Sequence, residues 1–482
     1  MAVTTIGGMN TGLDIKGLVT AMVNAEKAPK ADQLSKLQTK TTSQISGLGS
    51  LKAGIANLQS VMDSLNDAKL FQARTATSSD STLVAASAST KAASANYSIS
   101  VTSLASASTV ASATVAKDAT FAGGGSLTIS LGSDALGTVT LPTGKESTLS
   151  EVGAAINTQL KDKGVSATVV TNPTDGKARL MLTSSTMGAG NDITLSATGD
   201  LANLAIPAKD PSVISTADGV QYIAQAANAK FSINGLSLES NSNTVGDAIE
   251  GVTLTLTSPT VVKTTTGSTT SSSDKPITLT VAEDKSGVKS NIRKFVDAYN
   301  SLITTTSSLT QVTKVGDDKQ PIAAALVGDS GVRQILSTMR GELGNPQSGG
   351  SGNIRILADL GITTGQDGKL VINDTKLTEA LDTNYSAVAD FFTGDNGLMN
   401  RLDSKLAVYT QTGGILESRV SGLNGTIKSI DQQNDALDMR MDKLQERLLA
   451  QFNAMDSLVG QMTGTSNRLM AALSSMPGVV KS

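Results

Sequence analysis

The side chains that carry most enzyme chemistry are scarce in this sequence, and two types are absent. The 482 residues include no Cys and no His. The chain therefore has no thiol nucleophile, no Cys/His metal site and no imidazole base that titrates near neutral pH. Carboxylate, Lys and Ser chemistry remain, but no Ser lies in a nucleophile-elbow motif and no catalytic constellation is visible. We therefore expect that the protein is not an enzyme.

Two pairs of aspartates offer the oxygen ligands that hard cations prefer. The pairs are Asp317 with Asp318 and Asp367 with Asp374. Neither pair has the spacing of a calcium-binding loop, and solvated loops explain both pairs better. The glycine-rich stretches match no nucleotide-binding motif and are more typical of turns. We therefore predict no metal and no cofactor.

Charge and hydropathy narrow the range of partners. The formal net charge is -3 and the sequence has no run of Lys or Arg, which argues against a nucleic-acid partner. No stretch of about 18 consecutive apolar residues appears, so we expect no membrane span. The first residues lack the basic start, apolar block and cleavage site of a secretory signal peptide. We therefore expect the chain to stay inside the cell or to leave it by another route.

Apolar residues at helical spacing dominate the N-terminal end. Residues 13–70 are predicted to be helical, beginning with a short amphipathic piece that ends or kinks near Pro29. The apolar face of this piece consists of Ile15, Leu18 and Met22. A longer helix then follows the heptad pattern of a coiled coil, weakened by Thr41 and Gln44. Its seam residues are Leu34, Leu37, Leu48, Leu51, Ile55, Leu58, Met62 and Leu65.

A second and stronger heptad pattern occupies the C-terminal end. Asn434 and Gln451 lie at seam positions, where a buried amide fixes the register of paired helices at a cost in stability. A third helix after Asp284 has the same apolar spacing. The C-terminal seam residues are Leu416, Val420, Leu423, Ile427, Ile430, Leu437, Met441, Leu444, Leu448, Met455, Leu458 and Met462.

The sequence between these helices is typical of β structure. Short runs alternate apolar and polar residues, as half-buried strands do, and the Asn-Gly dipeptide at 234–235 predicts a hairpin turn. One helix interrupts the strands, because Thr148 and Glu151 form a capping box before an apolar stripe. Residues 264–275 are rich in Ser and Thr and are predicted to form a flexible loop or linker.

The order of these patterns predicts an α+β multidomain protein, with discontinuous helical coiled-coil terminal domains and inserted β-rich domains. The end helices offer too little apolar area to offset the cost of ordering them. We therefore predict that the outermost segments are disordered when free and fold against partner helices. The predicted domains are terminal helical segments at 1–35 and 445–482, a helical-bundle or α+β stem at 36–75 and 284–444, a β-rich domain at 76–112 and 225–283, and an outer β-rich domain at 113–224.

The helical seams could pair helices of this chain or helices of a partner. An intramolecular bundle is the more frequent cause of heptads, and both readings hold if the inner seam pairs the chain's own helices while the outer ends bind partners. The candidate functional residues are therefore seam residues. We assign assembly to Ile15, Leu18, Met22, Leu48, Leu51, Ile55, Leu58, Leu437, Met441, Leu444, Leu448, Met455, Leu458 and Met462, and register to Asn434 and Gln451.

Several segments are specific enough to suggest a family. They are IGGMNTGLDIKGLV (6–19), NAEKAPK (24–30), LADLGITTGQDGKLVIN (357–373), YTQTGGILESRVSGLN (409–424) and QFNAMDSLV (451–459). These segments resemble flagellar filament cap proteins of the flagellar hook-associated protein 2 family. Residues 125–196 are also similar to the β-rich insert shared by flagellins and hook-associated proteins. Together the resemblance covers most of the chain.

The resemblance implies a secreted structural protein of the bacterial flagellum. It implies export through the flagellar type III channel without a cleaved signal peptide, and an extracellular location at the flagellum tip. It further implies a ring-like homo-oligomer of five or six subunits that promotes flagellin folding and insertion, filament elongation and motility. Implied partners besides flagellin are the hook-filament junction proteins and a cytoplasmic export chaperone at the C-terminal helix.

Two alternative functions stay open at this point. The first is a flagellin-like axial filament subunit, although the GLDIKGLV segment at 12–19 is unlike a flagellin start. The second is a surface adhesin that binds mucin or other glycans through the outer β-rich domains, a role that is compatible with capping.

Overall fold

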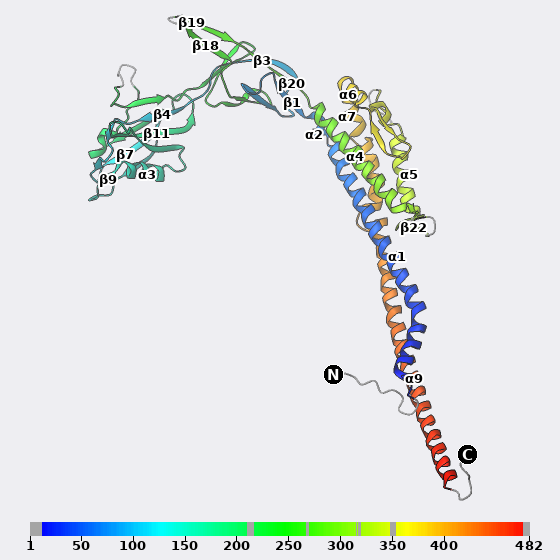
Figure 1. Cartoon of the computed structure of the whole chain (residues 1–482). Helices are drawn as coiled ribbons and strands as arrows, with labels where there is room; N and C mark the ends of the chain where they lie inside the picture. The colour runs from blue at the N-terminus through cyan, green and yellow to red at the C-terminus, as the bar shows by residue number, and fades with distance from the viewer. Residues whose placement is uncertain are drawn as a thin grey trace. The chain divides into compact units, whose positions relative to one another are not determined.

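The computed structural model describes residues 12–209, 216–266, 269–314, 316, 320–347 and 353–475 (Figure 1). The chain divides into two compact units: unit 1 contains Met1–Leu70 and Lys285–Ser482, and unit 2 contains Phe71–Asp284. Unit 2 is therefore inserted between the two chain segments of unit 1. This arrangement confirms the predicted α+β multidomain fold, with discontinuous helical terminal segments and inserted β-rich structure.

Unit 1 is mainly helical. Two long helices come from opposite ends of the chain, and shorter helices and two small hairpins join them. The elements are α1 (Ile15–Asn66), α2 (Ala68–Gln72, which crosses the unit boundary), α4 (Lys285–Thr310), β21 (Val312–Thr313), β22 (Ile322–Ala323), α5 (Ser330–Gly344), η2 (Leu357–Leu360), β23 (Ile362–Thr364), β24 (Leu370–Ile372), α6 (Asp374–Thr383), α7 (Tyr385–Phe392), α8 (Leu398–Thr410) and α9 (Ile415–Ser474).

Helix α1 is one continuous helix, which corrects the prediction of a break near Pro29. The Asp14 carboxylate accepts a hydrogen bond from the Gly17 backbone N–H at 2.8 Å and caps its first turn. Pro29 lies inside the helix and is exposed, so water can solvate the Ala25 carbonyl that loses its partner. The neighbouring residues, AEKA at 25–28 and KA at 30–31, are strong helix formers, which offsets the missing hydrogen bond.

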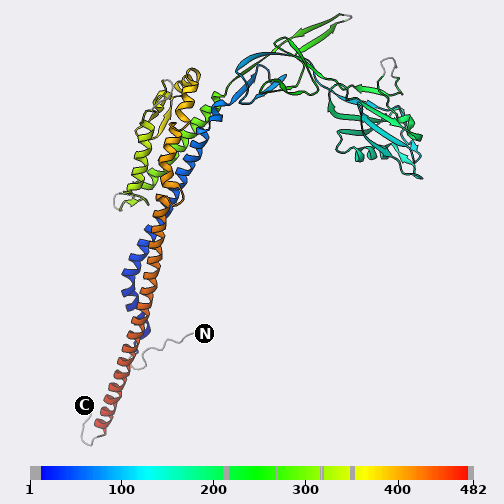
Figure 2. The same ribbon diagram turned by 180° about the vertical axis from the view of Figure 1, so that it is seen from behind.

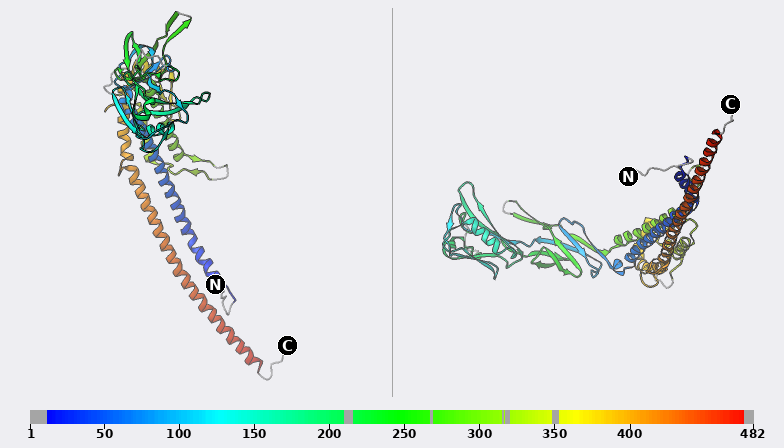
Figure 3. Two further views of the ribbon diagram at one scale, coloured as in Figure 1. Left: turned by 90° about the vertical axis from the view of Figure 1, so that its left-hand side faces the viewer. Right: turned by 90° about the horizontal axis from the view of Figure 1, so that it is seen from below.

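Helices α1 and α9 pack side by side and antiparallel (Figures 1, 2 and 3). The Lys27 ammonium lies 2.6 Å from the Asp438 carboxylate, and the Lys52 ammonium lies 3.7 Å from that of Glu417. Residue numbers therefore rise along α1 in the direction in which they fall along α9. Because α1 starts at Ile15, the last part of α9 continues past it, as the red end of the ribbon shows in Figure 2.

The inner half of unit 1 is a helical bundle in which α1 contacts α4, α8 and α9. Thr41, at a seam position of α1, is buried because its hydroxyl donates to the Leu37 carbonyl at 2.8 Å. The amide of Asn300 in α4 binds both backbone groups of Leu370, at 2.7 and 2.9 Å, and fixes the β23–β24 hairpin on the bundle. The buried stripe of α4 comprises Val288, Ile292, Phe295, Tyr299, Leu302 and Thr306.

Unit 2 contains two hydrophobic cores. The first lies between a five-stranded sheet, in the order β1-β20-β3-β14-β15, and a three-stranded sheet, in the order β16-β17-β2. The Asn-Gly turn at 234–235 joins β14 to β15 with both residues at positive φ, which confirms the predicted hairpin. The strands are β1 (Arg74–Ser78), β2 (Val84–Ala88), β3 (Ala95–Ser103), β14 (Ala229–Ile233), β15 (Leu236–Ser240), β16 (Thr244–Ile249), β17 (Val252–Leu256) and β20 (Ile277–Glu283).

The second core of unit 2 contains α3 (Leu149–Gln159) and three sheets, in the orders β10-β11-β4-β13, β12-β7-β8 and β6-β9. The predicted capping box is present, since the Glu151 N–H donates to the Thr148 hydroxyl at 3.3 Å and the Thr148 N–H donates to the Glu151 carboxylate at 2.8 Å. The other elements are β4 (Ala107–Ala111), β5 (Val115–Ala116), β6 (Thr120–Phe121), β7 (Ser126–Leu131), β8 (Asp134–Thr140), β9 (Ser147–Thr148), β10 (Val165–Thr171), β11 (Lys177–Met187), β12 (Ile193–Ala197), η1 (Gly199–Leu204) and β13 (Gln221–Ala224).

The Ser/Thr-rich segment is not the flexible loop that its composition predicts. Strands β18 (Val261–Thr266) and β19 (Thr269–Asp274) pair antiparallel in continuous register from Val261 and Asp274 to Thr266 and Thr269. At its base, the Thr260 hydroxyl accepts from the Val101 backbone N–H at 2.8 Å. β-branched threonines favour strand geometry, and this preference outweighs the low hydrophobicity of the segment.

Candidate assembly surface on the terminal helices

The predicted seam residues fall into three groups along unit 1. The inner group, in the middle of α1, is completely buried in the bundle, so these side chains cannot reach a partner while the bundle is folded. Each has a relative exposure of 0%. The inner group consists of Leu48, Leu51, Ile55 and Leu58.

The middle group joins the start of α1 to α9. Ile15, Val19 and Val23 are buried against Met441 in a small core of their own. Leu18 and Met22, which the sequence places on the same face as Ile15, are instead 44% exposed. Sequence reasoning missed Val19 and Val23, although both are apolar and continue Ile15 at intervals of four. The partly buried members contributed by α9 are Leu437, Leu444, Leu448, Leu449 and Phe452.

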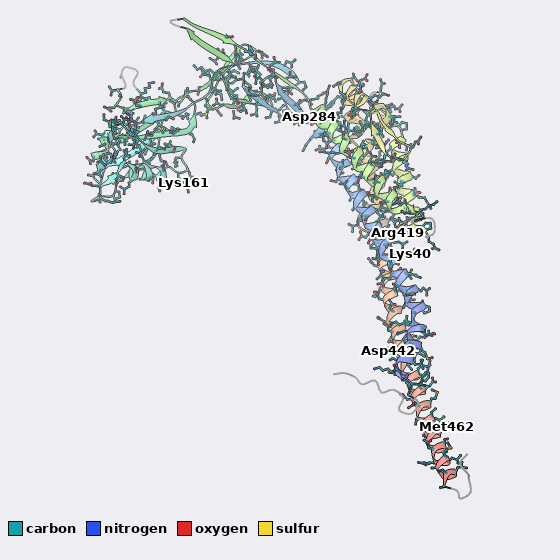
Figure 4. The ribbon with its side chains drawn as sticks, viewed as in Figure 1. Lys40, Lys161, Asp284, Arg419, Asp442 and Met462 are labelled. Atoms are coloured by element: carbon teal, nitrogen blue, oxygen red, sulfur yellow. The ribbon has the colours of Figure 1, made fainter. Side chains whose placement is uncertain are left out.

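The outer group lies on α9 beyond the start of α1 and forms an exposed apolar stripe. Met455, Leu458 and Met462 are 43%, 56% and 66% exposed, and Leu469 continues their heptad spacing at 64%. Figure 4 marks Met462. We call these four residues the tail stripe. Within the described part of unit 1, α1 does not extend far enough to cover them. Met455, Leu458 and Met462 were predicted as seam residues and Leu469 was not; together with the exposed Leu18 and Met22 they are available to a partner.

The two predicted register residues lie in different surroundings. Asn434 is half-buried beside the middle group, whereas Gln451 is exposed. Asn434 therefore lies where an amide can influence the pairing of α1 with α9. Gln451 has no such position within the described fold, and its register role stays a prediction for a seam with a partner.

A charge pair connects α9 to α5 in the bundle. The Arg419 guanidinium binds both carboxylate oxygens of Asp329, one of them at 3.0 Å (Figure 4). The same carboxylate caps α5 by accepting from the backbone N–H groups of Gly331 and Val332, at 2.8 and 3.1 Å. The Arg419 hydrogen bonds, helped by these N–H groups, hold the pKa of Asp329 below its usual range.

Replacing Asp329 by Asn is expected to lower the free energy of unfolding of unit 1 by about 1–3 kcal/mol at neutral pH, because charge-assisted hydrogen bonds are lost. The folded-state pKa is depressed, so the contribution is complete above the unfolded pKa, near 3.9, and is lost as the pH falls through the folded value. The difference between wild type and variant should therefore shrink in acid. Chemical unfolding at a series of pH values measures it, and an unchanged difference at low pH would contradict the assignment.

The aspartates considered as metal ligands have other partners or lie outside the described residues. The Asp374 carboxylate binds Arg293 and lies 3.2 Å from the Lys289 ammonium, and the Arg293 hydrogen bond is the main cause of its lowered pKa. Asp367 accepts from the Lys369 backbone N–H at 3.1 Å in a turn. Asp317 and Asp318 are not among the described residues.

Two searches of the described residues bear on other classes of site. No group of three or more acidic residues there is arranged to hold a metal ion. No helix in the described part of the chain is both long and apolar enough to cross a membrane.

Family models and related sequences both identify the family that the sequence segments resemble. Residues 11–108 match the flagellar hook-associated protein 2 N-terminus family, and residues 226–464 match the flagellar hook-associated protein 2 C-terminus family. The chain is 48% identical over 486 residues to the A-type flagellar hook-associated protein 2 of Pseudomonas aeruginosa, covering 99% of each chain. It is 34% identical over 472 residues to the flagellar hook-associated protein 2 of Escherichia coli (strain K12), covering 96% of each.

A solved structure supports the same relationship. The fold is similar to that of the D1-D2-D3 domains of the flagellar cap protein FliD from Escherichia coli, with a TM-score of 0.58 and 34% identity. The match covers 78% of this chain and 99% of that one. Together with the exposed tail stripe and the paired terminal helices, these similarities confirm the family that the sequence segments suggested: the chain belongs to the flagellar hook-associated protein 2 family.

Proposed function

We propose that this chain is a flagellar filament cap, a structural component of the bacterial flagellum that forms a ring at the distal tip of the filament. The observation that carries the proposal is the tail stripe, an exposed apolar face of α9 that a partner helix could cover. The chain is also similar to a flagellar cap protein. The cap promotes flagellin folding and insertion by shape and helix packing. It thereby supports filament elongation and motility without making or breaking covalent bonds.

The tail stripe gives this proposal a physical basis. A fully buried Met or Leu side chain contributes about 1.5–3 kcal/mol relative to an exposed one. These four side chains are on average a little over half exposed, so covering the tail stripe offers roughly 3–7 kcal/mol per chain before the costs of association. A partner helix that continues the seam of α9 would gain this amount. Other copies of the chain and the filament subunits beneath the cap are the proposed sources of such helices.

The comparisons do not favour the two alternative functions. The chain is related along nearly its whole length to hook-associated proteins, which supports capping over a flagellin-like filament subunit. A surface adhesin that binds glycans has no comparable support. Mucin binding through the outer β-rich structure therefore stays a prediction, together with a number of five or six subunits in the ring.

Export and the remaining partners belong to the same proposal. The chain would travel through the flagellar export channel without a cleaved signal and assemble outside the cell at the tip. Its exposed tail stripe is a suitable site for a cytoplasmic export chaperone, because a chaperone could cover the stripe until assembly. The hook-filament junction proteins would provide the platform on which the first ring assembles.

Complementation of a bacterium that lacks its own cap protein tests the proposal. The full chain is expected to restore long filaments and swimming, and to reduce the flagellin monomer lost into the medium. A chain that ends at residue 454, and so lacks the tail stripe, is the control and should fail. Secretion of the full chain without any gain in filament length would overturn the proposal. Light scattering over a concentration series would then show whether the chain forms rings, unlimited polymers or neither.

The predicted disorder of the ends leads to a separate expected result. In dilute monomer, amide hydrogens in residues 15–35 and 445–474 should exchange rapidly, because only a small core and exposed helix surface stabilise this end. In the assembled cap they should exchange slowly. Hydrogen exchange read by mass spectrometry measures both states, and strong protection in the monomer would contradict the idea. The rest of the predicted terminal segments, residues 1–11 and 476–482, lies outside the described residues.

A further inference from the structure

The charges on α9 between residues 431 and 447 are separated by sign onto two sides of the helix. Four aspartates follow one another at intervals of four, three and four, and at about 100° per residue they lie within about 60° around the helix. Three basic residues follow at intervals of three and four and cluster equally tightly, about 140° away. The acidic flank consists of Asp431, Asp435, Asp438 and Asp442, with Glu446 at its edge, and the basic flank consists of Arg440, Lys443 and Arg447.

The two flanks lie on opposite sides of the seam between α9 and α1. The ion pairs of this region show the sides: Lys27 of α1 reaches Asp438 on the acidic flank, and Glu26 reaches Arg440 on the basic flank, at 2.6 and 3.8 Å. Asp442, on the acidic flank, is marked in Figure 4. The pair of α1 and α9 thus presents the acidic flank on one side and the basic flank on the other.

The basic flank borders an open groove between the two helices, with a volume of about 880 Å³. Two methionines on its wall, Met22 and Met439, are 44% and 61% exposed. A second hollow of about 340 Å³ lies beside it and shares Glu26 and Arg440. The groove is lined by Met22 and Glu26 of α1 and by Met439, Arg440, Lys443 and Arg447 of α9, among others. It therefore combines apolar surface with positive charge, which suits a helix that carries carboxylates.

This separation of charge destabilises an isolated helix. Asp431 with Asp435, Asp438 with Asp442, and Lys443 with Arg447 are like-charged neighbours four residues apart, a spacing at which such pairs repel. Among the described residues, the side chains of Asp431, Asp435, Lys443 and Arg447 form no ion pair that would offset the repulsion. Carboxylates and cations kept apart in this way gain most from a partner with the opposite charge.

We propose that a second copy of this chain is that partner, and that the acidic flank of one copy docks against the basic groove of the next. Both complementary surfaces belong to the same stretch of α9, so two copies standing side by side bring them together. Contact between different faces of identical copies is head-to-tail, and such contacts close into a ring when the rotation between neighbours allows it. The inference rests on the proposed cap function and specifies the surfaces that join its subunits.

Charge reversal in the full-length chain tests the proposal. One variant reverses the basic flank, Lys443→Glu with Arg447→Glu, and a second reverses the acidic flank, Asp431→Lys with Asp435→Lys. A third carries all four changes. Arg440 and Asp438 stay unchanged because they hold α1 and α9 together. The matched control for the basic-flank variant is Lys161→Glu with Lys163→Glu, the same charge change at exposed positions of unit 2.

Sedimentation velocity between 0.05 and 0.5 M NaCl, about the range over which screening strengthens markedly, measures self-association. The wild type should associate more weakly as salt rises, and each single-flank variant should need at least a tenfold higher concentration to assemble. The four-change variant should assemble with itself again, yet should not mix with fluorescently labelled wild type. The control should behave as wild type, and circular dichroism should show equal helix content for all chains.

Several outcomes would overturn the proposal. Single-flank variants that assemble as the wild type does would exclude these surfaces, as would a four-change variant that mixes freely with wild type or assembles no better than the single-flank variants. A wild type that stays monomeric at every concentration would also refute it. Restored filaments in the complementation experiment would in each case leave the cap function standing. Loss of capping with unchanged self-association would assign the basic groove to the filament subunit instead.

Discussion

Alanine at both Leu51 and Leu58 is expected to leave the helical bundle of unit 1 close to unfolded at room temperature. Each side chain is 0% exposed, and each buried leucine truncated to alanine costs about 2–5 kcal/mol through lost transfer free energy and an unfilled cavity. The two residues lie about 10 Å apart along α1, so their costs should nearly add. The sum of about 4–10 kcal/mol approaches the whole stability of a typical domain, about 5–15 kcal/mol.

Circular dichroism during chemical unfolding measures this loss, since helix dominates unit 1. The matched control is Leu18→Ala, the same substitution on the same helix at a side chain that is 44% exposed, and it should change the free energy of unfolding by only about 0.5 kcal/mol. A double variant that loses less than about 2 kcal/mol would mean that the inner seam is not the core of the bundle.

Burial could be predicted from the sequence where the apolar residues form one narrow stripe on a helix. In α1 the heptad positions from Leu48 to Leu65 are all buried, because only one stripe of that helix is apolar and its register admits one orientation. The capping box before α3 and the Asn-Gly turn between β14 and β15 are likewise local signals whose geometry depends on neighbouring residues. Such features can be predicted because few other arrangements satisfy them.

Contacts could not be predicted from the sequence where the apolar face of a helix is wide, or where two interacting residues lie far apart in the chain. Apolar side chains occupy six of the nine positions from 15 to 23, and α9 covers only the part that contains Val19 and Val23. Leu18 and Met22 therefore face outward although their spacing is equally regular. The pair of Asp329 with Arg419 joins residues 90 positions apart, and no periodicity connects them. Only the fold of unit 1, in which α8 packs against both α5 and α9, brings these two side chains together.

Two predictions from local sequence, a helix break at Pro29 and a flexible Ser/Thr-rich loop, were wrong because the surrounding structure outweighs the local preference. Pro29 removes one backbone hydrogen bond, but the helix formers around it and the solvent beside it make that loss tolerable, so α1 continues. The Ser/Thr-rich hairpin offers little apolar area, yet strand pairing satisfies the backbone groups of both its strands. In both segments the state of the backbone hydrogen bonds, and not hydrophobicity, explains the observed structure.

Serine at Met455, Leu458 and Met462 together is expected to abolish filament growth while leaving the folded chain intact. These three side chains belong to the tail stripe and are already 43%, 56% and 66% exposed, so the substitutions remove little buried surface within the chain. In the cap the surface that these side chains still expose would be covered, which contributes about 0.8–1.7 kcal/mol each. The sum is about 2.5–5 kcal/mol, and since about 1.4 kcal/mol corresponds to tenfold in affinity, association should weaken at least roughly fiftyfold.

Swimming and filament length in the complemented cap-deficient bacterium measure the effect, and chemical unfolding of the purified chain shows that unit 1 is unchanged. Val312→Ser with Ile322→Ser is the control, because both side chains, 55% and 62% exposed, lie on unit 1 outside the tail. The control should swim as the wild type does. If the triple variant also supports normal filaments, the tail stripe is not an assembly surface, and the contacts of the cap must lie on the flanks of α9 or elsewhere. Loss of swimming together with loss of stability would instead mean that the stripe already stabilises the folded chain, which its exposure argues against.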